Sequence, residues 1–184
     1  MLRSGADEAW KLAHARVAAS RDMRNILASG TIAMLGVAAP GEQTIVAGEP
    51  LLLRWEGGRP SFHLGLAQAG SAAAVVGESA VRKAQLDLGS FAPGAYELTI
   101  FGAAGVPLKL PLRLVAATEV PSAPDTDAIS DPHGRALLQA VWLLTRGDPT
   151  WRLAALSRLY ALASENDLIA QSIVGVPDAT GPAR

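Results

Sequence analysis

The amino-acid sequence predicts a mainly β fold, an antiparallel sandwich or barrel with an N-terminal helix and a C-terminal helical hairpin beside it. From about residue 31 to residue 117, short apolar runs alternate with a period of two and are separated by Gly and Pro, as in strands joined by turns. Before and after this region, apolar residues recur at helical spacing. Strands and helices do not alternate along the chain, which argues against a doubly wound nucleotide-binding sheet.

The composition supports a globular chain and excludes several classes of protein. The 184 residues are 49% hydrophobic and 18% charged, with a formal net charge of −1, which suits one domain with its own apolar core. The basic residues are scattered, unlike those of a nucleic-acid-binding surface. Cysteine is absent, which excludes disulfides and thiolate chemistry. Alanine and arginine are abundant while lysine is rare, which indicates a GC-rich bacterial coding sequence.

Residues 1–30 are expected to form an amphipathic helix and a connector. Ser4 and Asp7 stand three residues apart, as in a capping box. Trp10, Ala13 and Val17 fall on one face at helical spacing.

The apolar run over residues 26–40 follows three arginines and resembles a late signal sequence or a signal anchor. Its fifteen residues are fewer than the ~20 that a membrane-spanning helix requires. We therefore expect a β-strand over Thr31–Val37. A second interpretation stays open, in which the chain is a soluble fragment that begins just after a membrane anchor.

The central region, residues 31–117, contains six to eight expected strands. In each of them every second residue is apolar, as in a strand with one buried face. These apolar residues are Leu51, Leu53 and Trp55; Phe62, Leu64 and Leu66; Leu86 and Leu88; Tyr96, Leu98 and Ile100; and Leu108, Leu110, Leu112 and Leu114. Gly57–Gly58 is expected to form a hairpin turn, and Gly77 is expected to mark another turn.

Residues 118–131 are rich in Pro, Ser, Ala and Asp and are expected to be a solvated linker. Residues 132–176 are then expected to form a helical hairpin with a third short helix, and residues 177–184 a frayed tail. Asp131 and Asp148 each precede a proline, so both are predicted N-caps with Pro at the first helical position. The expected helices are Pro132–Arg146, Pro149–Ala163 and Glu165–Val174.

Three runs, over residues 51–55, 62–66 and 86–100, resemble bacterial immunoglobulin-like domains of the fibronectin type III sort. The resemblance covers about residues 41–116 and implies an immunoglobulin-like sandwich. It implies that Trp55, at the end of an early strand, packs in the core. It also implies that the hydroxyl of Tyr96, which follows Phe91 and Pro93, ties down a corner. The absence of cysteine excludes the disulfide-linked antibody type.

Catalysis finds no support in the sequence. The histidines His14, His63 and His133 lie in three different segments, without the spacing of a metal-binding pair on one helix. We expect His63 on the outer face of a strand and His133 at a helix N-terminus. Residues 125–131 are acidic but lack the Gly and the downstream Glu of an EF-hand loop. The sequence therefore predicts a protein that is not an enzyme and that has no catalytic residue, cofactor or metal.

One sheet face is a candidate for binding a partner. If the strands that carry Phe62, Tyr96 and Leu110 are neighbours, as the resemblance implies, their outward residues share a face. The residues predicted to bind there are His63, Glu97, Thr99, Phe101, Lys109 and Arg113. The small residues Gly65 and Ala67 leave room beside an apolar anchor. Two occupants are open: the chain's own helices, which carry Trp10 or Trp142 and Trp151, or a partner protein.

Trp142 is a candidate oligomer contact. It lies within Val141–Leu144, four consecutive apolar residues that make this helix apolar nearly all round. Either the sheet and the second helix or a second copy of the chain must cover such a helix.

The favoured function is a non-catalytic protein-interaction or assembly module of a bacterial protein, envelope-associated or regulatory. Its expected partner is another protein or a second copy of the chain, without nucleic acid. A membrane is expected only through an anchor at or before the start of this chain, and the envelope side is favoured over the cytoplasm. The alternative is a ligand-binding domain or an enzyme with a site between sheet and helices.

Overall fold

A computed structural model of the 184-residue chain describes residues 31–37, 41–68, 71, 74–124 and 126–175. The helix predicted over residues 1–30 and the tail predicted over 177–184 lie outside the described residues.

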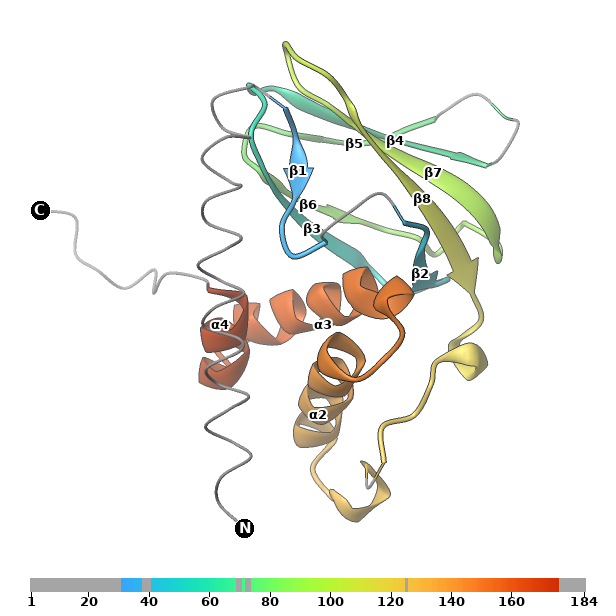
Figure 1. The fold of residues 1–184 in the computed structure, drawn as a ribbon, viewed down its shortest axis with the longest axis vertical. Coiled ribbons are helices and arrows are strands. Elements are labelled where there is room, and N and C mark those ends of the chain that lie inside the picture. The colour runs from blue at the N-terminus through green and yellow to red at the C-terminus, as the bar shows by residue number, and fades with distance from the viewer. Residues whose placement is uncertain (1–30, 38–40, 69–70, 72–73, 125, 176–184) are drawn as a thin grey trace, which may run out of the picture.

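The described strands form two sheets that pack face to face (Figure 1). The three-stranded sheet has the order β1 (Ala33–Met34), β3 (Leu51–Glu56) and β6 (Lys83–Leu86). The five-stranded sheet has the order β2 (Gln43–Val46), β8 (Leu108–Val115), β7 (Gly94–Phe101), β4 (Phe62–Gln68) and β5 (Ala74–Ser79). All described pairs are antiparallel except β2 with β8, which is parallel.

This arrangement confirms the predicted fold class, an immunoglobulin-like sandwich with flanking helices. The period-two pattern buries one side of each strand: Leu51, Leu53 and Trp55 face the inside of the sandwich, while the residues between them are only half-buried. The ring of Trp55 meets that of Phe62 from the opposite sheet edge-on, with centroids 5.2 Å apart. Both rings are fully buried, so they join the two sheets through apolar contact.

The corner that the resemblance implies is present. The hydroxyl of Tyr96 donates a hydrogen bond to the backbone carbonyl of Ala92, at 3.0 Å. The ring of Phe91 packs edge-on against Tyr96, with centroids 5.8 Å apart. This contact fixes the chain where it passes from β6 in one sheet to β7 in the other.

Two of the predicted turns are corrected by the structure. Gly57 and Gly58 both have positive φ, but they carry the chain from β3 to β4, which belong to different sheets and do not pair. They are therefore a crossing between sheets and no hairpin. Gly77 lies inside β5 and no turn occurs there, since it pairs with Leu64 of β4.

The first strand is shorter than the predicted Thr31–Val37. Its ladder contains only Ala33 opposite Glu56 and Met34 opposite Trp55. Gly36 has a φ of 76°, a left-handed conformation that turns the backbone out of the strand.

The helical part begins with two short 3₁₀ turns, Ala117–Glu119 and Thr126–Ala128. Helix α2 (Pro132–Thr145) follows, then a 3₁₀ turn (Pro149–Trp151), helix α3 (Arg152–Ser164) and helix α4 (Leu168–Val174). Both predicted N-caps are confirmed: the carboxylate of Asp131 accepts from the backbone of His133 and Gly134, and that of Asp148 from Thr150.

The third helix begins later than predicted. Residue Asn166 adopts a φ of 70°, which interrupts the helix after α3. The next residue, Asp167, then caps α4 by accepting from the backbone N–H of Ala170.

The helices lie below the strands, next to β3 of the three-stranded sheet and β2 of the five-stranded sheet, with β4 and β5 on the far side (Figure 1). Helix α3 packs against β2 and β3, and its buried residues Leu153, Ala154 and Ala155 belong to the same core cluster as the sandwich. Two long-range hydrogen bonds fix it: Gln43 accepts from the backbone of Leu153 at 3.1 Å, and the hydroxyl of Ser157 accepts from the backbone of Leu52 at 2.9 Å. The sandwich and the first turn of α3 therefore share one core.

The segment predicted as a solvated linker is instead fastened to α2. The side chain of Gln139 accepts from the backbone N–H of Ala123 and donates to the carbonyl of Pro121, at 2.8 and 2.6 Å. The side chain of Ala123 is buried. A single glutamine on the facing helix thus holds a segment whose composition alone is typical of a linker.

Candidate functional site

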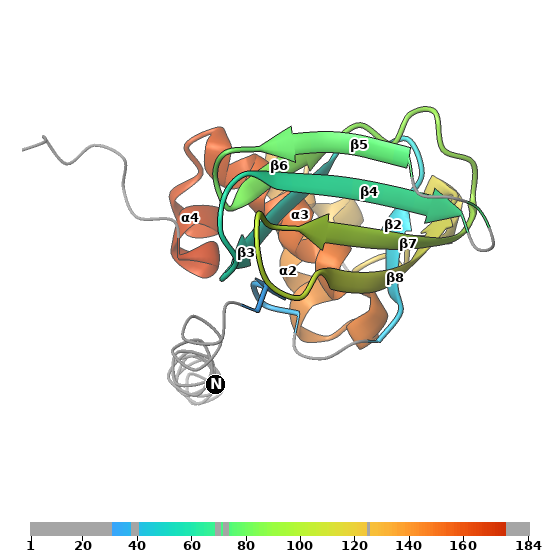
Figure 2. The ribbon, with the colours of Figure 1, turned by 90° about the horizontal axis from the view of Figure 1, so that it is seen from above.

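The six residues predicted for a binding face lie on neighbouring strands, β4, β7 and β8. The register places His63 opposite Phe101, Thr99 opposite Lys109, and Ala95, two residues before Glu97, opposite Arg113. The sheet order thus confirms that the three strands are neighbours. Figure 2 shows β5, β4, β7 and β8 toward the viewer, with α2 and α3 behind them.

The described helices do not cover this face. The sequence left open that the helix carrying Trp142 or the turn carrying Trp151 packs there, and the structure corrects this. Trp151 is buried in the main core and Trp142 packs against that core, on the helical side of the molecule. Helix α3 lies instead against β2 and β3, and Leu52 on the outer side of β3 lines a cleft with Tyr160 and Ala163 of α3. The helix of Trp10 lies outside the described residues.

The face has small side chains near its centre and exposed apolar side chains on the strands to either side. Phe101 is 43% exposed and Val75 of β5 is 67% exposed. On β4, between their strands, the outward positions are His63, opposite Phe101, and then Gly65 and Ala67, which have little or no side chain. Thr99 also points outward by register but is only 5% exposed, so its neighbours cover it and it offers little surface to a partner.

The charged residues of the face are paired with one another. His63 Nδ1 lies 3.2 Å from Glu78 Oε1, and Lys109 Nζ donates to Glu97 Oε1 at 3.0 Å. Arg113 lies 4.0 Å from Glu119 at the margin. All these side chains are well exposed, so each pair adds little to stability. The pairs nevertheless leave the face close to electrical neutrality.

Sequence reasoning missed the contribution of β5 to this face. Val75 and Glu78 lie on that strand, and it was missed because Gly77 suggests a turn. The short run Ala74–Ser79 nevertheless has two β-branched residues in succession, which is a strand signal. A Cβ on Gly77 would lie 3.2 Å from Leu86, so the glycine allows the two sheets to approach closely.

Trp142, the predicted oligomer contact, is half-buried. It packs against the main core, whereas its neighbour Val141 packs against a second, smaller cluster formed by α2, α3 and α4. The apolar character of α2 on both sides is therefore used within the chain.

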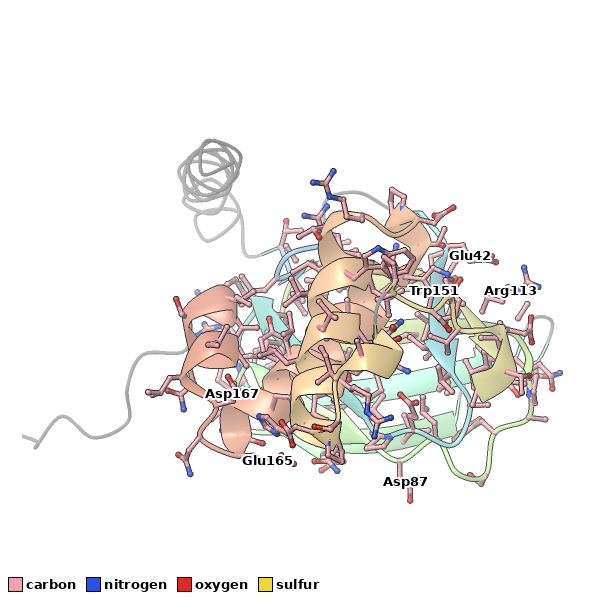
Figure 3. The ribbon with its side chains drawn as sticks, turned by 90° about the horizontal axis from the view of Figure 1, so that it is seen from below. Glu42, Asp87, Arg113, Trp151, Glu165 and Asp167 are labelled. Carbon is pink, nitrogen blue, oxygen red and sulfur yellow. The ribbon has the colours of Figure 1, made fainter. Side chains whose placement is uncertain are left out.

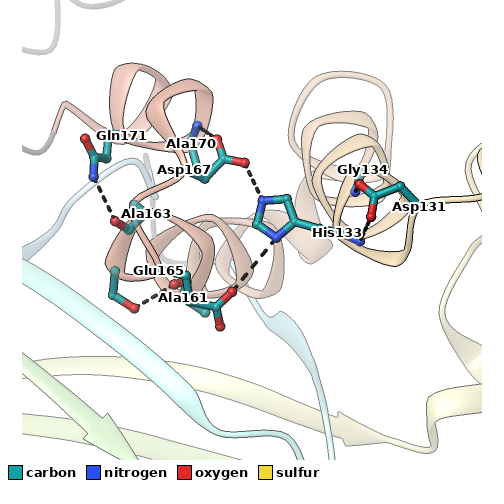
Figure 4. Close-up of polar contacts among 10 residues, drawn as sticks. Asp131, His133, Gly134, Ala161, Ala163, Glu165, Asp167, Ala170 and Gln171 are labelled. Carbon is teal, nitrogen blue, oxygen red and sulfur yellow. Dashed lines mark hydrogen bonds and ion pairs between the residues drawn. The ribbon is translucent and has the colours of Figure 1, made fainter.

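His133 joins the start of α2 to the start of α4 (Figure 4). Its Nε2 donates to the carboxylate of Asp167, and its Nδ1 lies 3.9 Å from Glu165. The hydrogen bond to Asp167 raises the pKa of His133, with the nearby carboxylates adding to the effect and burial opposing it. Seen from the helical side, Glu165 and Asp167 lie close together, far from Arg113 at the opposite margin (Figure 3). The prediction that His133 lies at a helix N-terminus is confirmed.

Within the described ranges, no group of three or more His, Asp or Glu side chains is arranged to hold a metal ion. The His133 contacts are those of an ordinary ion pair between two helix ends.

Among the described helices, none has the length and apolar character needed to cross a bilayer.

Comparisons with known proteins do not decide the function of this chain. No family model and no curated protein matches this sequence. Among solved structures, the chain is similar to the crystal structure of DIP-gamma IG1+IG2, with 12% sequence identity and a TM-score of 0.27. The match covers 46% of this chain and 47% of that chain, so the chain spans about half the length of that structure.

Proposed function

We propose that this chain is a non-catalytic protein-interaction module of a bacterial protein, and that it binds its partner through the outer face of the five-stranded sheet. The observation that carries the proposal is the exposure of Phe101, a large apolar side chain that is 43% exposed. It lies near small outward residues of β4, on a face that the described helices leave uncovered. The bacterial assignment is supported by the composition and by the resemblance to bacterial fibronectin type III-like modules.

The shape of the face favours apolar recognition. The exposed side chains of Phe101 on β7 and Val75 on β5 lie on either side of β4, whose residues Gly65 and Ala67 have little or no side chain. A large exposed apolar side chain beside small ones is a suitable centre for a protein–protein interface, since a few large side chains carry most of the binding energy.

The charges of the face favour selection by shape over selection by charge. Each exposed cation on it, His63 when protonated, Lys109 and Arg113, already lies beside a carboxylate of the same chain. A face with little net field does not steer a strongly charged partner. We therefore expect a partner that brings an apolar surface, and an affinity that changes little with salt.

The experiment compares three immobilised proteins: wild type, Phe101→Glu and Val106→Glu. Val106 is 67% exposed outside the strands, so the same apolar-to-acidic change there is a matched control. Proteins retained from a lysate of the source organism are quantified by mass spectrometry. The leading candidate is then purified and titrated against all three proteins, with amide NMR shifts mapped on the wild type.

The expected result is a partner that binds wild type and Val106→Glu alike, binds Phe101→Glu at least ~10-fold more weakly, and shifts amides of β4, β7 and β8. Self-association of the wild type that Phe101→Glu alone abolishes would support the assembly form of the proposal. Equal binding to Phe101→Glu, or shifts confined to other elements, would overturn it.

A further inference from the structure

A second surface, independent of the proposed partner face, lies where the three-stranded sheet meets the end of α3. It is a cleft of about 530 Å³ between the outer face of β3 and β6, the loop after β5, and the last turns of α3. A cleft of this volume is within the range of small-molecule sites.

Two cations face each other in this cleft without a carboxylate between them. Arg54 of β3 lies directly opposite Lys83 of β6 in the antiparallel ladder, and both line the cleft. Like charges in directly opposite positions repel. In the part of the chain that the structure describes, neither side chain forms an ion pair, and no Asp or Glu lines the cleft.

Tyr160 of α3 supplies a further donor. It is only 9% exposed and lines the cleft, and its ring lies 5.5 Å from the guanidinium carbon of Arg54. Its hydroxyl makes no hydrogen bond to another described residue. Burial raises the pKa of Tyr160, and the charge of Arg54 opposes the shift only in part. The hydroxyl is therefore a neutral donor at physiological pH.

The remaining lining is apolar or small. Leu52 and Ala163 provide the apolar part of the wall. The side chain of Gln85, on the same outward side as Lys83, also has no partner among the described residues. The cleft thus combines an apolar wall with several donors and no acidic group.

The other large cavity makes a useful contrast. It measures about 590 Å³ and lies between α2, α3 and the 117–126 segment. Its polar groups are mostly used within the chain: Arg158 forms a two-point ion pair with Glu49, and Gln139 binds the backbone of the segment. In the cleft at Arg54 the hydroxyls of Ser79 and Ser164 are also used within the chain. The side chains of Arg54, Lys83 and Tyr160 have no hydrogen-bond partner among the described residues.

We propose that the cleft binds a small organic anion, with its carboxylate or phosphate group between Arg54 and Lys83 and its apolar body against Leu52 and Ala163. A bound anion removes the repulsion between the two cations and accepts the charge-assisted hydrogen bonds that both can donate. The hydroxyl of Tyr160 is a third donor to the same group.

The test is an amide NMR titration of the full chain with four probes: benzoate, phenyl phosphate, inorganic phosphate and benzyl alcohol. Benzyl alcohol has the apolar body without the charge, and inorganic phosphate has the charge without the body. The variants are Lys83→Gln and Arg54→Gln. Lys109→Gln, the same change of an exposed lysine on the other sheet, is the matched control.

The expected result is a saturable shift of cleft amides with benzoate or phenyl phosphate, and a weaker or absent effect with inorganic phosphate and benzyl alcohol. Lys83→Gln should raise the Kd about tenfold, Arg54→Gln at least as much, and Lys109→Gln not at all. Binding should weaken as salt rises from 50 to 500 mM, a range that shortens the screening length from more than ~10 Å to only a few ångström. A benzoate or phenyl phosphate Kd that Lys83→Gln leaves unchanged would overturn the proposal. So would cleft shifts that benzyl alcohol reproduces, or no shift with any anion.

Discussion

The outer faces of the two sheets differ in whether a helix packs against them. The three-stranded sheet has α3 against it at β3. Helix α3 accepts a hydrogen bond from the backbone of Leu52 in β3 and donates one to the side chain of Gln43 in β2. The outer face of the five-stranded sheet has no described helix over it (Figure 2). The outward side chains nearest to each position differ accordingly. Leu52 of β3 is apolar and half-buried, and its hydrogen-bonded contact with α3 lies at this point of the strand. The outward Arg54 and Lys83 line the cleft at the end of α3, whereas Lys109 and Arg113 of β8 are charged and exposed.

The comparison shows how the outward side chains of a sheet determine whether a helix can pack against it. An outward leucine close to the helix loses contact with water when α3 packs on it, which is favourable. An outward row of charged side chains would have to be desolvated by a covering helix, which is unfavourable. Phe101 is the exception on the uncovered face, and for that reason it is the residue on which the proposed partner contact depends.

The largest effect is expected from a matched pair of phenylalanines on the adjacent strands β4 and β7. Phe62 is fully buried between the sheets, and Phe101 is 43% exposed on the outer face. Phe62→Ala should cost about 3–5 kcal/mol of unfolding free energy because it leaves a cavity against Trp55. Phe101→Ala should cost less than about 1 kcal/mol, since little apolar area leaves the core. Urea unfolding measures both, and a large cost for Phe101→Ala would show that the outer face is covered within the chain.

The second prediction concerns the hydrogen bond that fixes α3 to β2 of the sandwich. Gln43 is 5% exposed and accepts the backbone N–H of Leu153. Gln43→Ala leaves that buried donor without a partner, which should cost about 1–3 kcal/mol. Glu42→Ala, at the exposed neighbouring position, should change stability by less than about 0.5 kcal/mol. Equal small effects of the two changes would mean that packing alone seats α3 on the sheet.

The sandwich could be predicted from the sequence because its signals are local. Period-two alternation identified the inward residues of β3, β4, β7 and β8, and the Pro–Gly–x–Tyr run identified the corner at Tyr96. The Asp–Pro pairs likewise gave the starts of the helical turns at Asp131 and Asp148. In each case the residues that specify the structure stand within a few positions of one another.

What could not be predicted depends on contacts between distant residues. The crossing at Gly57–Gly58 has the sequence of a hairpin turn, and only the pairing of β3 with β6 distinguishes the two. The seating of α3 depends on Gln43 and Leu153, which are 110 residues apart. The cleft donors Arg54 and Lys83 come together through strand register. Tyr160, which lies against Arg54, belongs to a helix far later in the chain.

The corner between the sheets gives a smaller effect. Tyr96→Phe removes the hydroxyl that donates to the carbonyl of Ala92 and keeps the ring contact with Phe91. The loss should be about 0.5–1.5 kcal/mol, the net value of one partly buried hydrogen bond. Tyr160→Phe removes a hydroxyl that has no described partner and should be close to neutral for stability. Calorimetric unfolding of the two variants decides whether the corner bond strengthens the link between the sheets.

The smallest effect concerns the helical layer alone and depends on pH. The pKa of His133 is raised in the folded chain, chiefly by its hydrogen bond to Asp167, so folding favours the protonated ring. This contribution is complete below the ordinary imidazole pKa of 6.5 and is lost as the pH rises through the raised value. The pKa of Asp167 is lowered, first by the backbone of Ala170 and then by His133. Its own contribution is therefore lost only as the pH falls below 3.8 toward the lowered value.

The bond between α2 and α4 should thus be strongest between about pH 4 and pH 6.5. Asp167→Asn tests this prediction because asparagine is as good an N-cap as aspartate but carries no charge to hold the imidazolium. An NMR titration should find the pKa of His133 lower in Asp167→Asn than in wild type. Glu97→Gln, on the far sheet, should leave it unchanged. If Asp167→Asn also leaves it unchanged, the contact with Asp167 is not what holds the proton, and the two helix ends are joined by packing around Ala170 and Ala140.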